Sequence, residues 1–264
     1  MNLYPYQSEG VRWLRTHRRA YLADEMGLGK TVQAVVAARE SQPGTTVVFC
    51  PASVVENWKR EWAAWGGPGN LRVVSYSTLI RMQERDALFG GSDLVICDEA
   101  HYLKSPSAKR SKAALKIAGS AKQAWLLSGT PVPNDVRELY SIFKALWPDL
   151  VPVSNARKWL ERYCLFTDTE YGPRVWGNTD HVKAELRPAL NTFMLRRRLR
   201  DIALELPPLR TTVQYLDIDS TLDEQIEELA GDMEDPEHLS TLRRLLGQYK
   251  APKVARILRE EIED

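Results

Sequence analysis

ADEMGLGKT, residues 23–31, is the stretch that decides how this chain is interpreted. Its last three residues, Gly-Lys-Thr, complete the pattern of a phosphate-binding loop, G-x-x-x-x-G-K-[ST], although Asp24 stands at the position of the first glycine. An apolar run ends at Ala23, and apolar residues at helical spacing follow Thr31, which is the strand–loop–helix context that such a loop needs. The alternative is a glycine-containing turn before a helix with an exposed lysine.

The residue types in this loop suit a nucleotide. Backbone N–H groups can close around phosphate oxygens because Gly27 and Gly29 lack Cβ atoms. Lys30 can reach the β- and γ-phosphates, and the hydroxyl of Thr31 can take a coordination position on Mg²⁺. We therefore predict a nucleotide site at the end of the preceding strand.

Five short apolar runs alternate with stretches of helical spacing through the first half of the chain. Near-continuous apolar strands that alternate with helices are typical of a parallel sheet covered on both faces. Polar residues follow the strands, at the edge where open α/β sheets bind ligands. We predict an α/β fold of this kind. The runs are residues 20–23, 45–50, 71–76, 93–97 and 123–128.

The pattern changes after Trp147-Pro148. Residues 149 to about 200 hold proline, aromatic and arginine residues with mostly helical or irregular signals. A strand-like run at 211–217 follows, and then a helical pattern with expected breaks near Asp235-Pro236 and Pro252. We predict a core over 1–148, a helical insert and closing segment over 149–209, and a strand that returns to the core, followed by helices, over 210–264.

Composition narrows the class of protein. The 264 residues fit one large domain or one domain with an insert, and a formal net charge of +1 means that a nucleic-acid partner would have to meet a local basic patch. The three cysteines are far apart, with no C-x-x-C pair, which argues against a zinc site or a disulfide framework and fits a reducing compartment. No apolar run is long enough to span a bilayer, so we expect no membrane partner and an intracellular location, cytoplasmic in a bacterium or phage-infected cell and nuclear in a eukaryote.

A second chemical signal is Asp98-Glu99-Ala100-His101, directly after the fourth apolar run. Asp98 can hold Mg²⁺ through water, and Glu99 can orient and deprotonate an attacking water. Two adjacent carboxylates could also be a solvated turn, but a phosphate loop and a later Asp-Glu pair at strand ends together favour nucleotide hydrolysis. Ser128-Gly129-Thr130-Pro131 follows the fifth run and could link the metal site to a neighbouring surface, although alone it indicates only a turn.

Aromatic and basic clusters have simpler explanations as well. Trp58, Trp62 and Trp65 share one helix face, where core packing is favoured over base stacking. The run 196–198 is interpreted as a solvated helix face or as a brace between lobes, and the arginines at 12, 15, 18 and 19 as a solvated face. A DNA surface is more credible for the basic residues after the Asp-Glu pair, which are Lys104, Lys109, Arg110 and Lys112.

As a set, these blocks closely resemble lobe 1 of the superfamily-2 helicase-like ATPases, and within them the SNF2-type DNA translocases. The resemblance covers nearly all of the chain, in the family's order, and the SNF2 form of the loop carries Asp at its first position. Arg162-Tyr163-Cys164 and the third motif favour the annealing-helicase (HARP-like) subgroup. The matching blocks are residues 3–7 (Q motif), 23–31 (motif I), 50–58 (motif Ia), 98–104 (motif II, a DEAH box), 127–134 (motif III), and 194–197 with 206–208 (the segment closing lobe 1).

The resemblance implies a RecA-like P-loop NTPase lobe with a helical SNF2-type insert, and it implies ATP and Mg²⁺ as cofactors. Gln7 would read the adenine edge, Glu99 would be the general base, and Thr31 with Asp98 would hold Mg²⁺. The residues implied to bind the nucleotide are Gln7, Met26, Gly27, Leu28, Gly29, Lys30 and Thr31. Those implied to couple the nucleotide state to DNA are His101, Ser128, Gly129 and Thr130.

The same resemblance implies double-stranded DNA as a partner, tracked through its phosphates. Such binding would be independent of sequence and sensitive to salt. The residues implied to face DNA are Pro51, Ser53, Ser75, Tyr76 and Lys104, and we add Arg196 and Arg197 from the basic run.

A second RecA-like lobe is the other implied partner. Lobe 2 supplies the arginine fingers in this family, and no second phosphate loop or arginine-finger motif occurs before Asp264. A trans arginine finger contributes roughly 10³–10⁵ in kcat. We expect this chain alone to bind ATP·Mg²⁺ weakly and to hydrolyse it slowly or not at all. The alternatives are a non-enzymatic ATP- or DNA-binding module and one lobe of a DExH RNA helicase.

Overall fold

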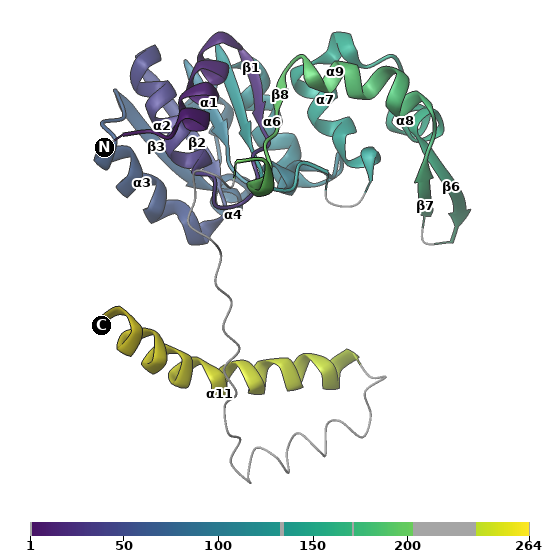
Figure 1. The fold of residues 1–264 in the computed structure, drawn as a ribbon. Coiled ribbons are helices and arrows are strands. Elements are labelled where there is room, and N and C mark those ends of the chain that lie inside the picture. The colour runs from purple at the N-terminus through teal and green to yellow at the C-terminus, as the bar shows by residue number, and fades with distance from the viewer. Residues whose placement is uncertain (1, 133–134, 171, 203–235, 264) are drawn as a thin grey trace. The chain divides into compact units, whose positions relative to one another are not determined.

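The computed structural model describes residues 2–132, 135–170, 172–202 and 236–263 (Figure 1). The chain divides into two compact units, residues 1–207 and 208–264. In the second unit, helix α11 (Pro236–Glu263) continues through Pro252, so the break expected at that proline is wrong. A proline removes one backbone hydrogen bond, and the remaining turns keep the helix continuous. The predicted strand at 211–217 and the block at 206–208 lie outside the described residues.

The first unit is built on a six-stranded parallel sheet, which confirms the predicted fold class. Its strand order is β3-β2-β4-β5-β1-β8. In the middle of the sheet, Ile96 lies between Val48 and Trp125, so β5 separates the strand of the phosphate loop from the strand of the Asp-Glu pair. The strands are β1 (Arg19–Leu22), β2 (Thr45–Cys50), β3 (Asn70–Ser75), β4 (Leu94–Cys97), β5 (Gln123–Leu127) and β8 (Met194–Leu195).

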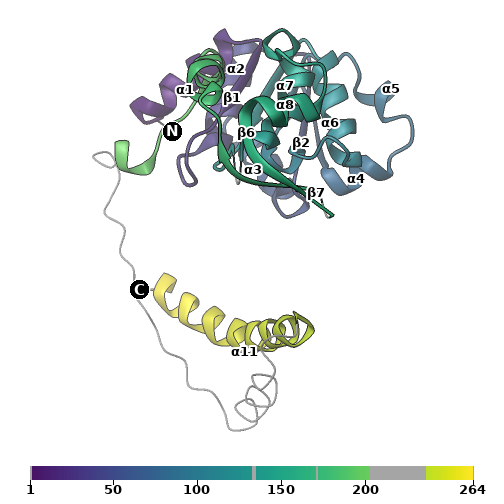
Figure 2. The same ribbon diagram turned by 90° about the vertical axis from the view of Figure 1, so that its right-hand side faces the viewer.

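Each face of the sheet has its own core because successive strand residues point to opposite sides. Ala20 and Leu22 belong to the core under one helical layer, whereas Tyr21 belongs to the core under the other. Trp58 and Trp62 are buried in the first core, as the helical spacing predicted, and Trp65 packs against it. Helices cover both faces of the sheet (Figure 2). The first layer holds α1 (Pro5–Thr16), α2 (Lys30–Ser41) and α3 (Val55–Ala64), and the second holds α4 (Tyr76–Arg81), α6 (Lys109–Ser120) and α7 (Tyr140–Leu146), with α5 (Arg85–Phe89) beside it.

The insert contains a β-hairpin that was not predicted. Strands β6 (Cys164–Thr169) and β7 (Gly172–Asn178) pair antiparallel directly after α8 (Ala156–Tyr163), with a register shift at Leu165/Phe166 (Figure 1). Two runs of aromatic and β-branched residues around a glycine are a hairpin signal, but the prolines and arginines nearby suggested irregular structure. The chain then passes through a π-helix (Val182–Leu186) and α9 (Arg187–Asn191) into β8.

The last described part of the first unit returns to the phosphate loop. Residues 193–199, called the closing segment here, run beside β1 and the residues after it. The backbone N–H groups of Tyr21, Ala23 and Glu25 donate to the carbonyl oxygens of Phe193, Leu195 and Arg197, at 2.8, 2.7 and 3.0 Å. The closing segment therefore lies against the start of the loop, although about 170 residues separate them in the chain. None of the described helices is both long and apolar enough to cross a membrane.

Candidate nucleotide-binding site

The phosphate loop connects β1 to α2 and depends on two left-handed glycines. Gly27 and Gly29 have φ angles of 86° and 69°, which cost glycine little and other residues more. Gly29 is also the N-cap of α2, so the N-terminus of a twelve-residue helix opens at the loop. A Cβ at Gly29 would lie 2.5 Å from Nε2 of Gln7. The structure thus brings the Q-motif amide directly against the loop.

Lys30 is folded back onto its own loop. Its Nζ donates to the carbonyl oxygens of Asp24 and Glu25, at 2.9 and 3.2 Å. Burial lowers the pKa of Lys30, and the nearby negative charges of Glu99 and Asp98 act in the opposite direction. The ammonium is therefore held at the loop, near both carboxylates of the DEAH box.

Asp98 follows β4 and is almost buried, with 8% of its surface exposed. Its Oδ1 accepts from the backbone N–H of Glu99 at 2.9 Å, and its Oδ2 accepts from Nε1 of Trp58 at 2.7 Å. Burial raises the pKa of this carboxyl group, and the hydrogen bond from Trp58 opposes that shift. The carboxylate is thus oriented by two donors that come from different elements.

Glu99 has an unusual backbone and an unsatisfied side chain. Its φ and ψ of 48° and 53° are left-handed, a conformation that costs a non-glycine residue about 1–3 kcal/mol. Its Oε2 lies 3.1 Å from Nδ1 of His101, but in the part of the chain that the structure describes no donor reaches this buried oxygen with hydrogen-bond geometry. A strained carboxylate with free acceptor capacity is suited to bind a water or another donor.

Motif III joins the loop to motif II. Nδ1 of His101 lies 3.1 Å from Oγ of Ser128 and 3.3 Å from Oγ1 of Thr130. A Cβ at Gly129 would lie 2.7 Å from Cγ of Met26 and 3.5 Å from Nζ of Lys30. The structure brings the four predicted coupling residues together, with the phosphate loop on one side, and their coupling role stays a prediction.

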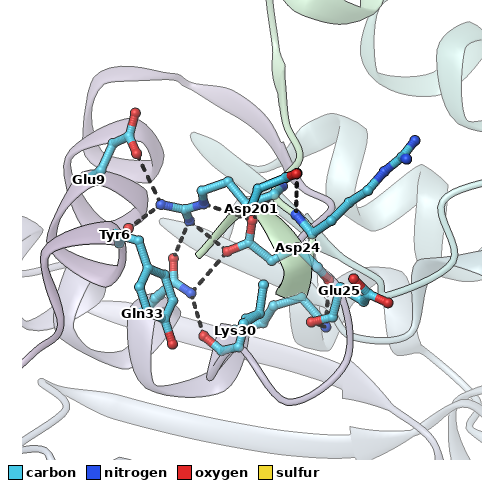
Figure 3. A network of polar contacts seen from close by, with 10 residues as sticks. Tyr6, Glu9, Asp24, Glu25, Lys30, Gln33 and Asp201 are labelled. Atoms are coloured by element: carbon cyan, nitrogen blue, oxygen red, sulfur yellow. Dashed lines mark hydrogen bonds and ion pairs between the residues drawn. The ribbon is translucent and has the colours of Figure 1, made fainter. Parts of the chain in front are cut away.

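Asp24 forms a buried network with the closing segment, which sequence reasoning missed (Figure 3). Its Oδ2 accepts from Nη2 of Arg197 at 2.6 Å, and its Oδ1 accepts from Nε of Arg197 at 3.0 Å. Nε2 of Gln33 donates to Asp24 Oδ2 and to the carbonyl oxygen of Leu28, at 3.1 and 2.9 Å. The network therefore holds both the start and the middle of the phosphate loop, and it explains why a carboxylate stands where a glycine is usual.

Arg197, one of the residues predicted to contact DNA, is bound inside the fold. Its side chain is 11% exposed, and Nη2 also donates to Oε1 of Gln33 at 2.9 Å. Nη1 donates to the carbonyl oxygen of Tyr6 and to Glu9, so the guanidinium ties α1 to the loop. A planar group with five donors fills such a site completely and has no donor left to face solvent. Arg196, exposed beside it, stays a predicted DNA contact.

Two more of the residues predicted to face DNA have hydrogen-bond partners inside the fold. Tyr76 is buried, and its hydroxyl donates to the carbonyl oxygen of Asp98 at 2.7 Å. Ser75 is buried as the N-cap of α4, where its Oγ accepts from the N–H of Thr78 at 3.1 Å. Both side chains are used inside the fold because the turn after β3 lies over the second core.

The other predicted DNA residues are at the surface. Pro51 and Ser53 line a groove of about 430 Å³ together with Lys109 and Arg110. Lys104 is paired with Glu138, whose Oε1 lies 2.8 Å from the lysine Nζ.

The arginines at 12, 15, 18 and 19 were expected to form a solvated face. This expectation is wrong for Arg19, which is half-buried. Its Nη2 donates to the carbonyl oxygens of residues 119 and 121, both at 2.8 Å.

The residues present fit a magnesium–nucleotide complex. The described residues contain no group of three or more His, Cys, Asp or Glu side chains that could hold a metal by itself. Mg²⁺ bound with a nucleotide needs fewer protein ligands, because phosphates and water supply most of its ligands and one or two protein oxygens complete the set. Asp98 and Thr31 offer oxygen ligands of the right kind, and a Cβ at Gly27 would lie in open space, which leaves room for phosphates.

Comparisons of the sequence with known proteins point to one protein family. The sequence matches the SNF2-related domain over residues 6–87 and 73–228. It is 32% identical over 259 residues to Protein CHROMATIN REMODELING 19 of Arabidopsis thaliana, a match that covers 81% of this chain and 32% of that protein. It is 32% identical over 233 residues to DNA annealing helicase and endonuclease ZRANB3 of Bos taurus, covering 78% of this chain and 22% of that protein.

Among solved structures, the Pyrococcus furiosus Hef helicase domain aligns with a TM-score of 0.48 and 13% identity, over 85% of this chain and 44% of that one. The chain thus spans only 22–32% of the length of the two curated relatives.

Proposed function

The chain belongs to the SNF2-related domain family, and from this premise we propose that it is the ATP-binding motor lobe of a DNA-stimulated ATPase. The whole enzyme translocates on double-stranded DNA and remodels DNA or protein–DNA complexes. The observation that carries the proposal is the meeting of Lys30, Asp98 and Ser128 at the carboxyl ends of β1, β4 and β5. Three distant motifs that serve one reaction converge at the edge where α/β sheets bind ligands.

The nucleotide is held by the loop and the Q motif in this proposal. The backbone N–H groups around Gly27 and Gly29 and the N-terminus of α2 bind phosphates, and Lys30 exchanges its loop carbonyls for phosphate oxygens. Gln7, placed against Gly29, recognises the adenine edge. Thr31 and Asp98 hold Mg²⁺, which when bound neutralises developing phosphate charge.

Glu99 is proposed as the general base. Its unsatisfied Oε2 can accept a hydrogen bond from a water, orient it toward the γ-phosphate and take its proton. His101, 3.1 Å from that oxygen, joins Glu99 to Ser128 and Thr130, and through them to the surface that meets DNA. DNA is bound by its phosphates at the groove beside Pro51 and at neighbouring basic residues.

We further propose that hydrolysis needs a second RecA-like lobe. The curated relatives are three to five times longer than the part this chain matches, which supports further regions acting with it. Without the arginine fingers of lobe 2, the present chain binds ATP·Mg²⁺ weakly and turns it over slowly. We place the enzyme inside the cell, where ATP and DNA are found.

Within the family we propose the annealing-helicase (HARP-like) subgroup. Similarity to ZRANB3, whose name describes a DNA annealing helicase and endonuclease, supports this assignment. ATP-driven rewinding of a partly unwound plasmid, coated with single-strand-binding protein, is the expected activity of the two-lobe enzyme. A two-lobe enzyme that hydrolyses ATP on duplex DNA but does not rewind this plasmid would contradict the subgroup assignment. The proposal of a DNA-stimulated ATPase would still stand.

The central experiment measures ATP turnover by a protein in which this chain is followed by its second lobe. We expect duplex DNA to stimulate the wild type and Glu99→Gln to lose about 10²–10⁴-fold in kcat. Glu161→Gln, on an exposed residue paired with Arg157, is the matched control and should keep full turnover. Stronger stimulation by RNA would favour a DExH RNA helicase, and ATP binding without turnover would favour a non-enzymatic module.

A further inference from the structure

Trp58 has a contact that core packing does not require. It is the fourth residue of α3, 0% exposed, and its ring fills the core between α3 and the sheet. Its Nε1–H nevertheless points at the DEAH box and donates to Oδ2 of Asp98 at 2.7 Å, across 40 residues of sequence. A buried indole donor close to a buried carboxylate is a strong, charge-assisted hydrogen bond.

The carboxylate of Asp98 has few other constraints. Within the described residues, each of its oxygens accepts one hydrogen bond, Oδ1 from the adjacent Glu99 N–H and Oδ2 from Trp58. The bond from Glu99 is local, because it comes from the next residue in the chain. The bond from Trp58 comes from another element, and the two bonds together fix the rotation of the carboxylate about the Cβ–Cγ bond.

We propose that Trp58 is a positioning residue for the metal-holding carboxylate. By holding Oδ2, its indole keeps Asp98 in one orientation toward the Mg²⁺ that accompanies the nucleotide. Donors behind a metal ligand typically contribute 10- to 100-fold to metal affinity. This inference rests on the proposed function, because only there does Asp98 hold Mg²⁺.

The position of α3 gives this bond a second consequence. Residues Ala52–Val54 form a short 3₁₀ turn that leads directly into α3, and Pro51 and Ser53 line the 430 Å³ groove proposed for DNA. Tyr76 lines the same groove and donates to the backbone carbonyl of Asp98 at 2.7 Å. Tyr76 in the groove and Trp58 in the helix that follows the groove-lining turn are thus both hydrogen-bonded to Asp98, which connects the groove proposed for DNA to the metal-holding residue.

The chain offers a matched control for this tryptophan. Trp62 lies one turn later on α3, is 5% exposed and packs in the same core. In the described part of the chain its Nε1 has no hydrogen-bond partner. Trp58→Phe and Trp62→Phe therefore remove the same atoms from similar surroundings, and only the first removes a hydrogen bond to Asp98.

The test measures binding of mant-ATP to the full 264-residue chain by fluorescence anisotropy, in EDTA and along a Mg²⁺ titration. Mg²⁺ should strengthen the binding of mant-ATP. We expect Trp58→Phe to raise about 10-fold the Mg²⁺ concentration at which this increase in affinity is half-maximal, and to leave the affinity for mant-ATP in EDTA unchanged. Trp62→Phe should match the wild type in both conditions. Equal Mg²⁺ dependence of the two variants would overturn the proposal.

Two further measurements keep the result unambiguous. β-(3-Benzothienyl)alanine at position 58 keeps the bicyclic ring and replaces the N–H by sulfur, which cannot donate, so it should reproduce the Mg²⁺ shift without a void in the core. A normal Mg²⁺ dependence of that protein would overturn the proposal even if Trp58→Phe proved unstable. Lys30→Ala tests the proposed function separately, because a wild-type chain that binds mant-ATP no better than Lys30→Ala contradicts the nucleotide site itself.

Discussion

At the scale of single residues, Asp24 shows how a departure from a sequence pattern can be structural. The first position of a phosphate loop is usually glycine, and here a carboxylate with 0% exposure occupies it. It is stabilised by Arg197 and Gln33, and Gln33 in turn binds the carbonyl oxygen of Leu28. A Cβ at Gly10 would lie 1.8 Å from Oε1 of Gln33, so a glycine in α1 is needed for the network to close.

Removing one partner of this ion pair should be strongly destabilising. We predict that Arg197→Met lowers the free energy of unfolding by about 3–5 kcal/mol, because it leaves the Asp24 carboxylate buried without its cation. Urea unfolding measures the change. Arg200→Met is the control, since that side chain is 73% exposed and its change should stay within about 0.5 kcal/mol.

A double variant separates charge from packing at this site. Asp24→Leu combined with Arg197→Met replaces both charges by apolar groups, which is often neutral or stabilising relative to a buried pair. We expect it to recover much of the stability that Arg197→Met loses. A double variant as unstable as the sum of its single changes would refute the ion-pair explanation.

At the scale of elements, one acidic side chain joins the segments on either side of the hairpin in the insert. Glu185, in the π-helix, accepts from Nε of Arg162 in α8 at 2.8 Å and from the hydroxyl of Tyr163 at 3.2 Å. His181 lies 3.0 Å away on the same helical segment. These contacts join the element before the hairpin β6–β7 to the element after it, so the sequence Arg162-Tyr163-Cys164 has a structural role in the insert.

The Arg162–Glu185 pair gives a pH dependence with a defined sign. The hydrogen bond from Arg162 is the largest influence that lowers the pKa of Glu185, to about 2 from its ordinary value of 4.5. A depressed carboxyl pKa stabilises the fold above the unfolded-state value, and this stability is lost as pH falls from 4.5 toward 2. Because the pair is partly solvated, we expect a modest effect.

The measurement is the melting temperature as a function of pH. Glu185→Gln should melt below the wild type at neutral pH, and the difference should shrink below pH 4.5. Glu161→Gln, an exposed change within α8, serves as the control. A gap between Glu185→Gln and the wild type that is the same at every pH would show that the contact acts by packing and not by charge.

At the scale of the whole molecule, the net charge is close to zero, so the proposed DNA binding depends on a local surface. The net charge of +1 gives no overall attraction to DNA. Lys109 and Arg110 line the groove beside Pro51, and Arg110 is held there by its hydrogen bond to the carbonyl oxygen of Tyr102 at 2.9 Å. A groove of this kind positions phosphates without reading bases.

Salt dependence tests this surface. We predict that Lys109→Ala weakens binding to duplexes of any sequence and reduces the slope of log K against log[salt] by about 1. Lys116→Ala, two turns later on α6 and paired with Asp86, is the matched control and should leave the slope unchanged. Loss of affinity for one DNA sequence but not another would contradict a phosphate contact.

Most of the fold and part of the site could be predicted from local sequence. The phosphate loop, the Asp98-Glu99 pair and the buried strands that carry them are short continuous patterns whose periodicity and residue types reflect their own immediate structure. A parallel sheet then places the carboxyl ends of its strands at one edge, so the meeting of motifs I, II and III follows from strand order.

The contacts that hold these motifs in place were decided by the tertiary structure. Arg197 and Asp24 are 173 residues apart, Trp58 and Asp98 are 40 apart, and Tyr76 reaches Asp98 across 22 residues. The sequence marked Arg197 and Tyr76 as surface residues and Trp58 as core, because residue type and spacing report only on a residue's own element. Which polar groups meet is determined by how elements pack, since most buried donors and acceptors are paired, and these are paired with groups that are distant in the sequence.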